Sequence, residues 1–336
     1  MNGARLETSL TETLFTKHAS VNVPLICGPM YPCSNPELVV AVSEAGGLGV
    51  VQPVSLTFVH GHDFRQGLRL IRQQTSRPVG MNALIEKSSQ RYHERMQKWV
   101  SIALEEGVRF FITSLGNPRW VVERVAEYGG IVYHDATERK WAMKALDAGV
   151  DGLIAVNNRA GGHAGGLSAS QLFDDLYDLN LPLICAGGIG DEKQFVEAMR
   201  MGYAGCQLGT RFIATDECRA AAPYKQAIVD AQERDIVLSE RITGVPVSLI
   251  NTPHVVAMGL KAGPLVRRML RGNRSKHWLR MLFTIRSAFQ LRHASLDESG
   301  EREFWQAGKS VAGIHQIEPA GEIVRRFYAA LLHMKR

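Results

Sequence analysis

Short apolar runs alternate with amphipathic segments at a steady interval between residues 20 and 235. The apolar runs are rich in Val, Ile and Leu, which is typical of strands buried on both faces of a parallel sheet. The segments between them have the spacing of helices with one apolar face. The pattern therefore predicts repeated strand–helix units. The expected strands are 23–29, 48–53, 79–85, 110–116, 131–136, 152–157, 181–189 and 205–212.

Residues that start and stop helices support this division. Pro36 suits the first turn of the helix after the first strand, and Gly46 suits its end. Further helices are expected near 63–74, near 89–106, from Pro118 onward and over 138–148. Eight units in about 220 residues favour an α/β fold of the (β/α)8 TIM barrel type. An open doubly wound sheet is the alternative, but "CGPMYPCSNP" after the first strand lacks the expected G-x-G-x-x-G.

Three parts are expected along the chain. The barrel should span 20–235, a helical lid or insertion 236–320, and a C-terminal helix packed on the barrel 321–336. The middle part contains a basic segment, 261–292, with nine Lys or Arg and no acidic residue. We favour a lid whose apolar face covers the barrel mouth. Contact with an anionic membrane surface or docking of an acidic carrier protein stays open.

Composition narrows the class of protein. The chain has 336 residues, 45% hydrophobic and 21% charged, with a net charge of +6, which is ordinary for a globular protein. Its five cysteines lack metal-type spacing, so we expect no metal site and a reducing compartment. The N-terminus is too polar for a signal peptide, and no run reaches the roughly 18 apolar residues of a membrane span. We expect a cytoplasmic protein with no nucleic-acid partner.

Unusual residues gather where the expected strands end, which is where barrels carry their chemistry. They are Gly28, Pro29 and Met30 after the first strand, Asn82, Ser114, and the pair His134 and Asp135. Glycine-rich ends follow the last two strands, in "CAGGIGD" and "LGTRF". Barrels often bind a phosphate between these two loops. The expected phosphate cradle is Gly187, Gly188, Gly209 and Thr210.

The loop after the sixth strand reads "RAGGHAGG" and places His163 among small residues. Glycines let this backbone approach a planar ligand closely, and they leave the imidazole as the one sizeable group of the loop that is expected to face the substrate. Histidine has a pKa near 7, as a base that removes a proton from a carbon acid requires. His163 is therefore the candidate catalytic base, and a purely structural histidine is the alternative.

Taken in order, these motifs resemble the nitronate monooxygenase family, also called 2-nitropropane dioxygenases. The resemblance rests on "GPM", "AVSEAGGLGVV", Asn82, "AGGHAGG", "CAGGIGD" and "QLGTRFIATDEC", and it covers roughly 20–255. The tail "WQAGKSVAGIHQIEPAGEIV" is similar to the closing segment of the family. These proteins are FMN-dependent barrels related to a flavin-type enoyl-acyl-carrier-protein reductase and to NADH:quinone reductases.

The resemblance implies FMN as cofactor and His163 as the catalytic histidine. It implies that Gly187, Gly188, Gly209 and Thr210 hold the FMN phosphate. The remaining expected cofactor contacts are Gly28, Pro29, Met30, Asn82, Ser114, His134, Gly161, Gly162 and Leu208.

The chain also departs from the family pattern. The family usually has a glutamate just before AGGH and a glutamine a few residues earlier, whereas this chain has Val156, Asn157, Asn158 and Arg159. Arg159 is either an attractor for an anionic substrate or part of a surface ion pair. His134 is either a ligand contact or a buried histidine with its own partner. Lys309 stands where the family more often has glutamine, and its side chain reaches either the flavin or solvent.

The expected activity is oxidation of alkyl nitronates or nitroalkanes by molecular oxygen, without nicotinamide. The first alternative is an NAD(P)H-dependent flavin reductase that acts on an enoyl thioester or a quinone. A barrel that binds a phosphorylated ligand without redox chemistry and a docking module that acts through its basic helices are further alternatives. The partners are then a small-molecule substrate and oxygen, and a homodimer stays open.

Overall fold

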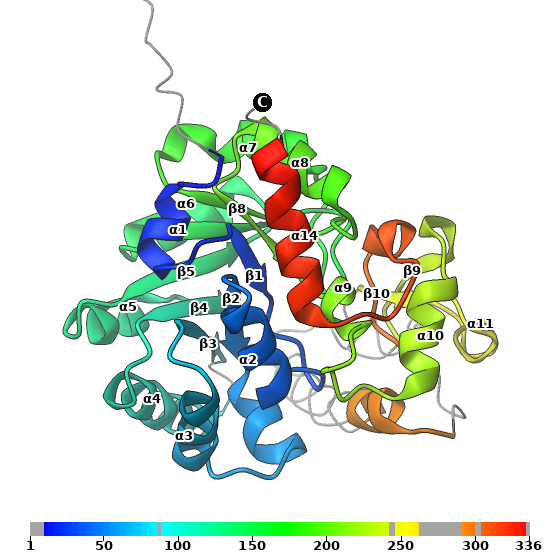
Figure 1. Ribbon diagram of the computed structural model, residues 1–336, viewed down its shortest axis with the longest axis horizontal. Coiled ribbons are helices and arrows are strands. Elements are labelled where there is room, and N and C mark those ends of the chain that lie inside the picture. The colour runs from blue at the N-terminus through cyan, green and yellow to red at the C-terminus, as the bar shows by residue number, and fades with distance from the viewer. Residues whose placement is uncertain (1–9, 87–88, 242–245, 262–289, 300–303, 334–336) are drawn as a thin grey trace, which may run out of the picture.

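Eight parallel strands close into a barrel in sequence order, as the computed structural model in Figure 1 shows. The structure describes residues 10–86, 89–241, 246–261, 290–299 and 304–333. The barrel closes where Leu25 and Cys27 pair with Cys206 and Leu208. The predicted TIM barrel is therefore confirmed. Its strands are β1 (Leu25–Cys27), β2 (Leu48–Val51), β3 (Val79–Ile85), β4 (Phe110–Leu115), β5 (Ile131–Ala136), β6 (Gly152–Val156), β7 (Leu183–Ala186) and β8 (Gly205–Leu208).

Helices follow the strands, close to the positions that the sequence predicts. Side-chain caps fix several of their first turns, including Asp63, whose carboxylate accepts a hydrogen bond from the Gln66 N–H. The run 205–212 is only half strand, because the chain turns at Gly209 and continues as a short helix. The helices are α2 (Pro36–Glu44), α3 (Phe64–Gln74), α4 (Gln90–Glu105), α5 (Arg119–Ala126), α6 (Arg139–Asp147), α7 (Ala169–Leu176), α8 (Glu192–Met201) and α9 (Thr210–Ile213), with η1 (Ser55–Val59) and η2 (Tyr177–Leu179).

Successive strand residues face opposite sides, so the barrel has an inner and an outer apolar layer. Ile26, Ile154 and Ile184 lie in the inner cluster. Phe15, from the N-terminal helix α1 (Leu14–Ala19), joins that cluster and packs edge-on against Phe110. Because these side chains fill the lower interior, a ligand inside the barrel would have to lie at the carboxyl ends of the strands.

Beyond the barrel the chain forms a group of smaller elements at one side, to the right in Figure 1. It contains α10 (Ala222–Asp230), η3 (Glu233–Asp235), β9 (Ile236–Ser239), β10 (Val247–Ile250) and α11 (Pro253–Met258). The strands β9 and β10 pair antiparallel, where the sequence suggested only helices. The basic segment 261–292 falls mostly on residues 262–289, which lie outside the described residues.

The last long helix, α14 (Ala320–His333), packs against α2 and α8 on the barrel (Figure 1). It buries Ile323, Val324 and Phe327 and is preceded by η4 (Lys309–Gly313). The chain thus brings residues from its far end against the first and last units of the barrel. Within the described ranges, no helix is both long and apolar enough to cross a bilayer.

Candidate active site

Polar side chains line the inner wall of the barrel at the carboxyl ends of its strands. The alternation that points Phe110 and Ile112 inward on β4 also points Ser114 inward, one step nearer the mouth. Asn82 on β3 is buried, and its side-chain amide donates to the Ile112 carbonyl at 3.1 Å. The inward-facing residues of this rim are Gly28, Asn82, Ser114, Asp135 and Gln207.

Two acceptor atoms of this rim are buried without a partner. They are Oδ1 of Asp135 and Oε1 of Gln207, and no described residue donates a hydrogen bond to either atom. A Cβ on Gly28 would lie 2.9 Å from Cγ of Gln207, so only glycine lets the first strand run this close to that side chain. Buried polar atoms are normally paired, so unpaired ones at a barrel mouth indicate a ligand with N–H or O–H groups.

The expected phosphate cradle lies at the ends of β7 and β8, which are neighbours in the barrel. Gly187 and Gly188 have φ angles of 116° and 79°, a left-handed backbone that glycine adopts without strain. Gly209 precedes α9, and the buried Thr210 opens it. The three glycines and the threonine of the expected cradle therefore lie together at one edge of the mouth.

The loop that carries His163 is fixed by contacts from outside the barrel. The Ser248 N–H of β10 donates to the Gly162 carbonyl at 2.8 Å, and Leu249 of the same strand pairs with Gln306. A Cβ on Gly161 would lie 2.9 Å from the Gly308 backbone nitrogen. The glycine loop is thus held between β10 and the segment that begins at Phe304.

The His163 imidazole itself is exposed, and no described residue hydrogen-bonds to it. The surrounding protein nevertheless desolvates the ring, which lowers the pKa of His163 below its ordinary value. The ring is therefore neutral at pH 7 and can accept a proton.

His134 points away from the mouth. It lies on the outer face of β5, where its Nδ1 is 2.8 Å from the Thr113 hydroxyl, and burial lowers its pKa to about 4. His134 is thus a buried histidine with its own partner, which was one of the two alternatives. No geometry in the described part of the structure supports a contact between His134 and a cofactor. The Leu208 side chain also packs in the outer layer, so only its backbone faces the first strand.

Arg159 and Lys309 meet at one carboxylate. The Arg159 guanidinium makes two hydrogen bonds of 2.8 Å with Glu233, and Lys309 Nζ is 3.5 Å from the same carboxylate. The Arg159 hydrogen bond lowers the pKa of Glu233. All three side chains are partly exposed. Arg159 therefore takes part in a surface ion pair, which was one of the two hypotheses for this residue.

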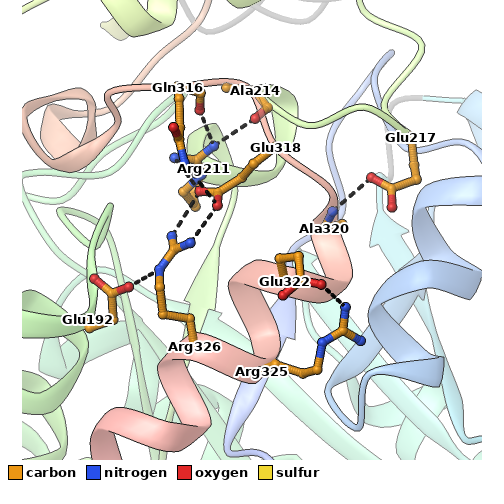
Figure 2. A network of polar contacts seen from close by, with 10 residues as sticks. All are labelled: Glu192, Arg211, Ala214, Glu217, Gln316, Glu318, Ala320, Glu322, Arg325 and Arg326. Carbon is orange, nitrogen blue, oxygen red and sulfur yellow. Dashed lines mark hydrogen bonds and ion pairs between the residues drawn. The ribbon is translucent and has the colours of Figure 1, made fainter.

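Sequence reasoning missed Arg211, which follows Thr210 and is almost fully buried. Figure 2 shows its guanidinium facing Glu318, with hydrogen bonds of 2.7 Å to the Ala214 carbonyl and 2.8 Å to the Gln316 carbonyl. Glu318 also binds Arg326 of α14, which in turn pairs with Glu192 of α8. Burial lowers the pKa of Arg211 to about 10, so the side chain stays charged. The sequence does contain a signal that could have identified Arg211, namely a charged residue inside the apolar run "LGTRFI".

Comparison with known proteins places these residues in a family. The family model for nitronate monooxygenase matches residues 12–329. A probable nitronate monooxygenase of Staphylococcus saprophyticus is 28% identical over 296 residues, covering 76% of this chain and 81% of the relative. A (3aS,4S,5R,7aS)-5-hydroxy-7a-methyl-1-oxo-octahydro-1H-indene-4-carboxyl-CoA dehydrogenase of Mycobacterium tuberculosis is 27% identical over 255 residues, covering 75% and 68%.

Solved structures give the same fold over nearly the whole chain. FabK from Thermotoga maritima has a TM-score of 0.78 and 26% identity, covering 96% of this chain and 97% of that one. Nitroalkane oxidase from Streptomyces ansochromogenes has a TM-score of 0.75 over 96% and 99% of the two chains. Its identity is 23%, so this likeness speaks for the fold alone.

Proposed function

Because this chain belongs to the nitronate monooxygenase family and is an oxidoreductase, we propose that it is an FMN-dependent enzyme that oxidises alkyl nitronates with molecular oxygen. A flavin oxidoreductase is the broader class that the family supports. The choice of FMN, of a nitronate or nitroalkane substrate and of oxygen as electron acceptor is our proposal.

The placement of His163 supports this proposal most directly. Its ring is neutral at pH 7, has no hydrogen-bond partner among the described residues, and lies on a glycine loop that β10 holds at the barrel mouth. A neutral imidazole can take a proton from the carbon beside a nitro group. His163 would then generate the nitronate from a nitroalkane, whereas a nitronate that binds already ionised would not need this step.

The rim fits a flavin in two respects. FMN carries ring N–H and ribityl hydroxyl donors, which the unpaired oxygens of Asp135 and Gln207 lack. It also carries a phosphate, for which the adjacent glycine turns after β7 and β8 offer backbone at close range. When bound, FMN would supply the electron-accepting chemistry that side chains lack. The residues that we propose to hold it are Gly28, Pro29, Met30, Asn82, Ser114, Gly161, Gly162, Gly187, Gly188, Gly209 and Thr210.

The proposal is tested with the purified chain and added FMN. We expect a yellow complex that consumes oxygen with 2-nitropropane or its nitronate and needs no NADH. Oxygen uptake should stop when FMN is omitted. A colourless protein that binds no flavin would contradict the proposal and would favour a barrel for another phosphorylated ligand.

A second candidate is a flavin reductase that uses NAD(P)H and acts on a thioester. It is favoured by the matched CoA-thioester dehydrogenase of Mycobacterium tuberculosis and by the likeness to FabK. In that case oxygen uptake with a nitronate should be negligible. Oxidation of NADH by an enoyl thioester should then be the faster reaction.

A further inference from the structure

Asp135 is an acidic residue inside the mouth of the barrel, and the proposed reaction does not use it. On β5, Ile131 and Tyr133 face the barrel interior, and Asp135 continues the same face one step nearer the carboxyl end. His134, between them, faces the outer layer. The carboxyl group of Asp135 therefore points into the rim that also contains Asn82 and Ser114.

Among the residues that the structure describes, no cation offsets the burial of this carboxyl group. Its Oδ1 is enclosed and has no hydrogen-bond partner among the described residues. The inward residues beside it are Ser114 on β4 and Ile154 on β6, and neither is charged. Tyr133 lies below it, and burial raises the pKa of that phenol, so the phenol is neutral too. His163, on the loop after β6, is a further titratable group near this side of the mouth.

Burial without a cation disfavours the carboxylate form. Desolvation alone raises the pKa of Asp135 to about 7. A carboxylic acid kept neutral in such a place differs from a carboxylate in one useful respect, because it can donate a hydrogen bond as well as accept one.

We propose that Asp135 contacts the flavin of the proposed site as a neutral carboxylic acid and donates a hydrogen bond to an acceptor atom of that ligand. This inference rests on the proposed function, since it takes the ligand to be a flavin. It assigns a role to a residue that the sequence places at the end of a strand but does not include among the expected cofactor contacts.

A neutral Asp135 makes flavin binding depend on pH. If the flavin binds the protonated form, its dissociation constant stays level below the pKa of Asp135 in the free protein. Above that pKa it rises about tenfold per pH unit. Asp135→Asn keeps the shape and a donor but cannot ionise, so its dissociation constant should not follow this rise. Asp147→Asn makes the same chemical change on the exposed face of α6 and should behave like the unmodified chain.

The experiment is a titration of the flavin-free protein with FMN and with riboflavin between about pH 6 and pH 9, followed by flavin fluorescence. Riboflavin is included because it lacks the phosphate, which itself titrates near pH 6. His163 is present in every variant, so its titration cancels in the comparison. We expect the dissociation constants of the unmodified chain and of Asp135→Asn to diverge with rising pH by at least tenfold at the alkaline end.

Calorimetry of the unmodified chain in buffers of different ionisation enthalpy gives a second readout that needs no variant. It should record proton uptake on flavin binding above neutral pH. The same pH dependence in the Asp135→Asn variant and the unmodified chain, or no proton uptake, would overturn the inference while the proposed function stands. Failure of both flavins to bind at any pH would overturn the proposed function and this inference together.

Discussion

His163 and Asp135 approach the barrel mouth from a loop and from a strand, and the same physical effect acts on both. Removal from water disfavours the charged form of each group, so it lowers the pKa of the imidazole and raises the pKa of the carboxyl. At pH 7 the imidazole is then largely neutral, and the carboxyl group, with a pKa of about 7, is protonated in about half of the molecules and more fully at lower pH. A base and a hydrogen-bond donor can thus share one site without attracting each other into an ion pair.

Replacement of His163 by alanine tests its role as a base. We expect turnover of neutral 2-nitropropane to fall by about 10² to 10⁴, the usual contribution of a positioned general base. Turnover of the preformed nitronate should change by no more than a few-fold, because that substrate has already lost its proton. Steady-state kinetics with both substrates measure this ratio. Equal losses on the two substrates would show that His163 binds or positions rather than removes a proton.

Asp135 should also affect stability as a function of pH. Its pKa is raised from 3.8 in the unfolded chain to about 7 in the fold, so the folded state holds the proton over a range where the unfolded state has lost it. The contribution of Asp135 to the free energy of unfolding is therefore greatest below pH 4. It decreases by as much as about 4 kcal/mol as the pH rises to about 7.

Urea denaturation at pH 5 and pH 8 measures this effect. Asp135→Asn should be more stable than the unmodified chain at pH 8, with a smaller gain at pH 5. Asp147→Asn should show no such difference, since its side chain is exposed. A gain for Asp135→Asn that is the same at both pH values would mean that the carboxyl group does not titrate in this range.

The sequence predicts that the proposed site lies at the strand ends, but it does not predict which side of each strand a residue faces. His134 and Asp135 are neighbours, and a shift of one residue exchanges the interior for the outer layer. Short apolar strands do not show which of two neighbouring residues faces the interior, so the sequence predicts a ligand contact for His134 and none for Asp135. Gln207 was missed for a related reason, because a single polar residue at the end of a strand can face either layer.

At the scale of elements, the antiparallel pair β9 and β10 links the His163 loop to the tail of the chain. The Ile250 N–H of β10 donates a hydrogen bond to the Trp305 carbonyl at 2.9 Å, near the contact between Ser248 and Gly162. Strands of four residues leave only a weak signal in a sequence, whereas the long periodic helices of the barrel were predicted nearly to the residue. This pair was therefore the principal element missing from the predicted fold.

The close approach of the tail to the loop gives a steric prediction. A Cβ on Gly308 would lie 2.5 Å from the Gly161 backbone nitrogen and 2.7 Å from the Arg159 carbonyl, so the backbone would have to move. Gly308→Ala should reduce stability by about 1–3 kcal/mol and weaken flavin binding. Gly166→Ala in the same loop meets nothing within 4 Å and serves as the control. Thermal unfolding and flavin titration measure both effects, and indistinguishable variants would contradict this packing.

At the scale of the whole molecule, the buried Arg211 holds the last helix against the last strand–helix unit of the barrel (Figure 2). Arg211→Met would leave the Ala214 and Gln316 carbonyls without their donor and Glu318 with one partner fewer. We expect a loss of about 3 kcal/mol in the free energy of unfolding.

Arg325→Met is the matched control, since Arg325 of α14 pairs with Glu322 on the exposed side of that helix. That pair is exposed to solvent on both sides, so its loss should change stability much less than the loss of Arg211. Chemical denaturation of both variants gives the comparison. Similar losses in the two would mean that the buried network does not anchor α14.

The closed barrel and the edge that carries the site followed from the alternation of apolar runs and from glycines at strand ends. Contacts between distant parts of the chain did not follow, because no local pattern encodes them. Phe15 fills the lower barrel from the N-terminal helix, and α14 returns from the far end to α2 and α8. The basic segment of 261–292 still carries only its sequence-based interpretation, a lid over the mouth.

Transfer of electrons from a nitronate to a bound flavin is the step on which the proposed function depends. Anaerobic mixing of the FMN-loaded protein with 2-nitropropane nitronate, followed at the visible flavin absorbance band, tests this step. We predict rapid loss of that band with the nitronate, its return when oxygen is admitted, and little change with NADH. Rapid bleaching by NADH with no response to the nitronate would contradict the account and would make the protein a nicotinamide-dependent reductase.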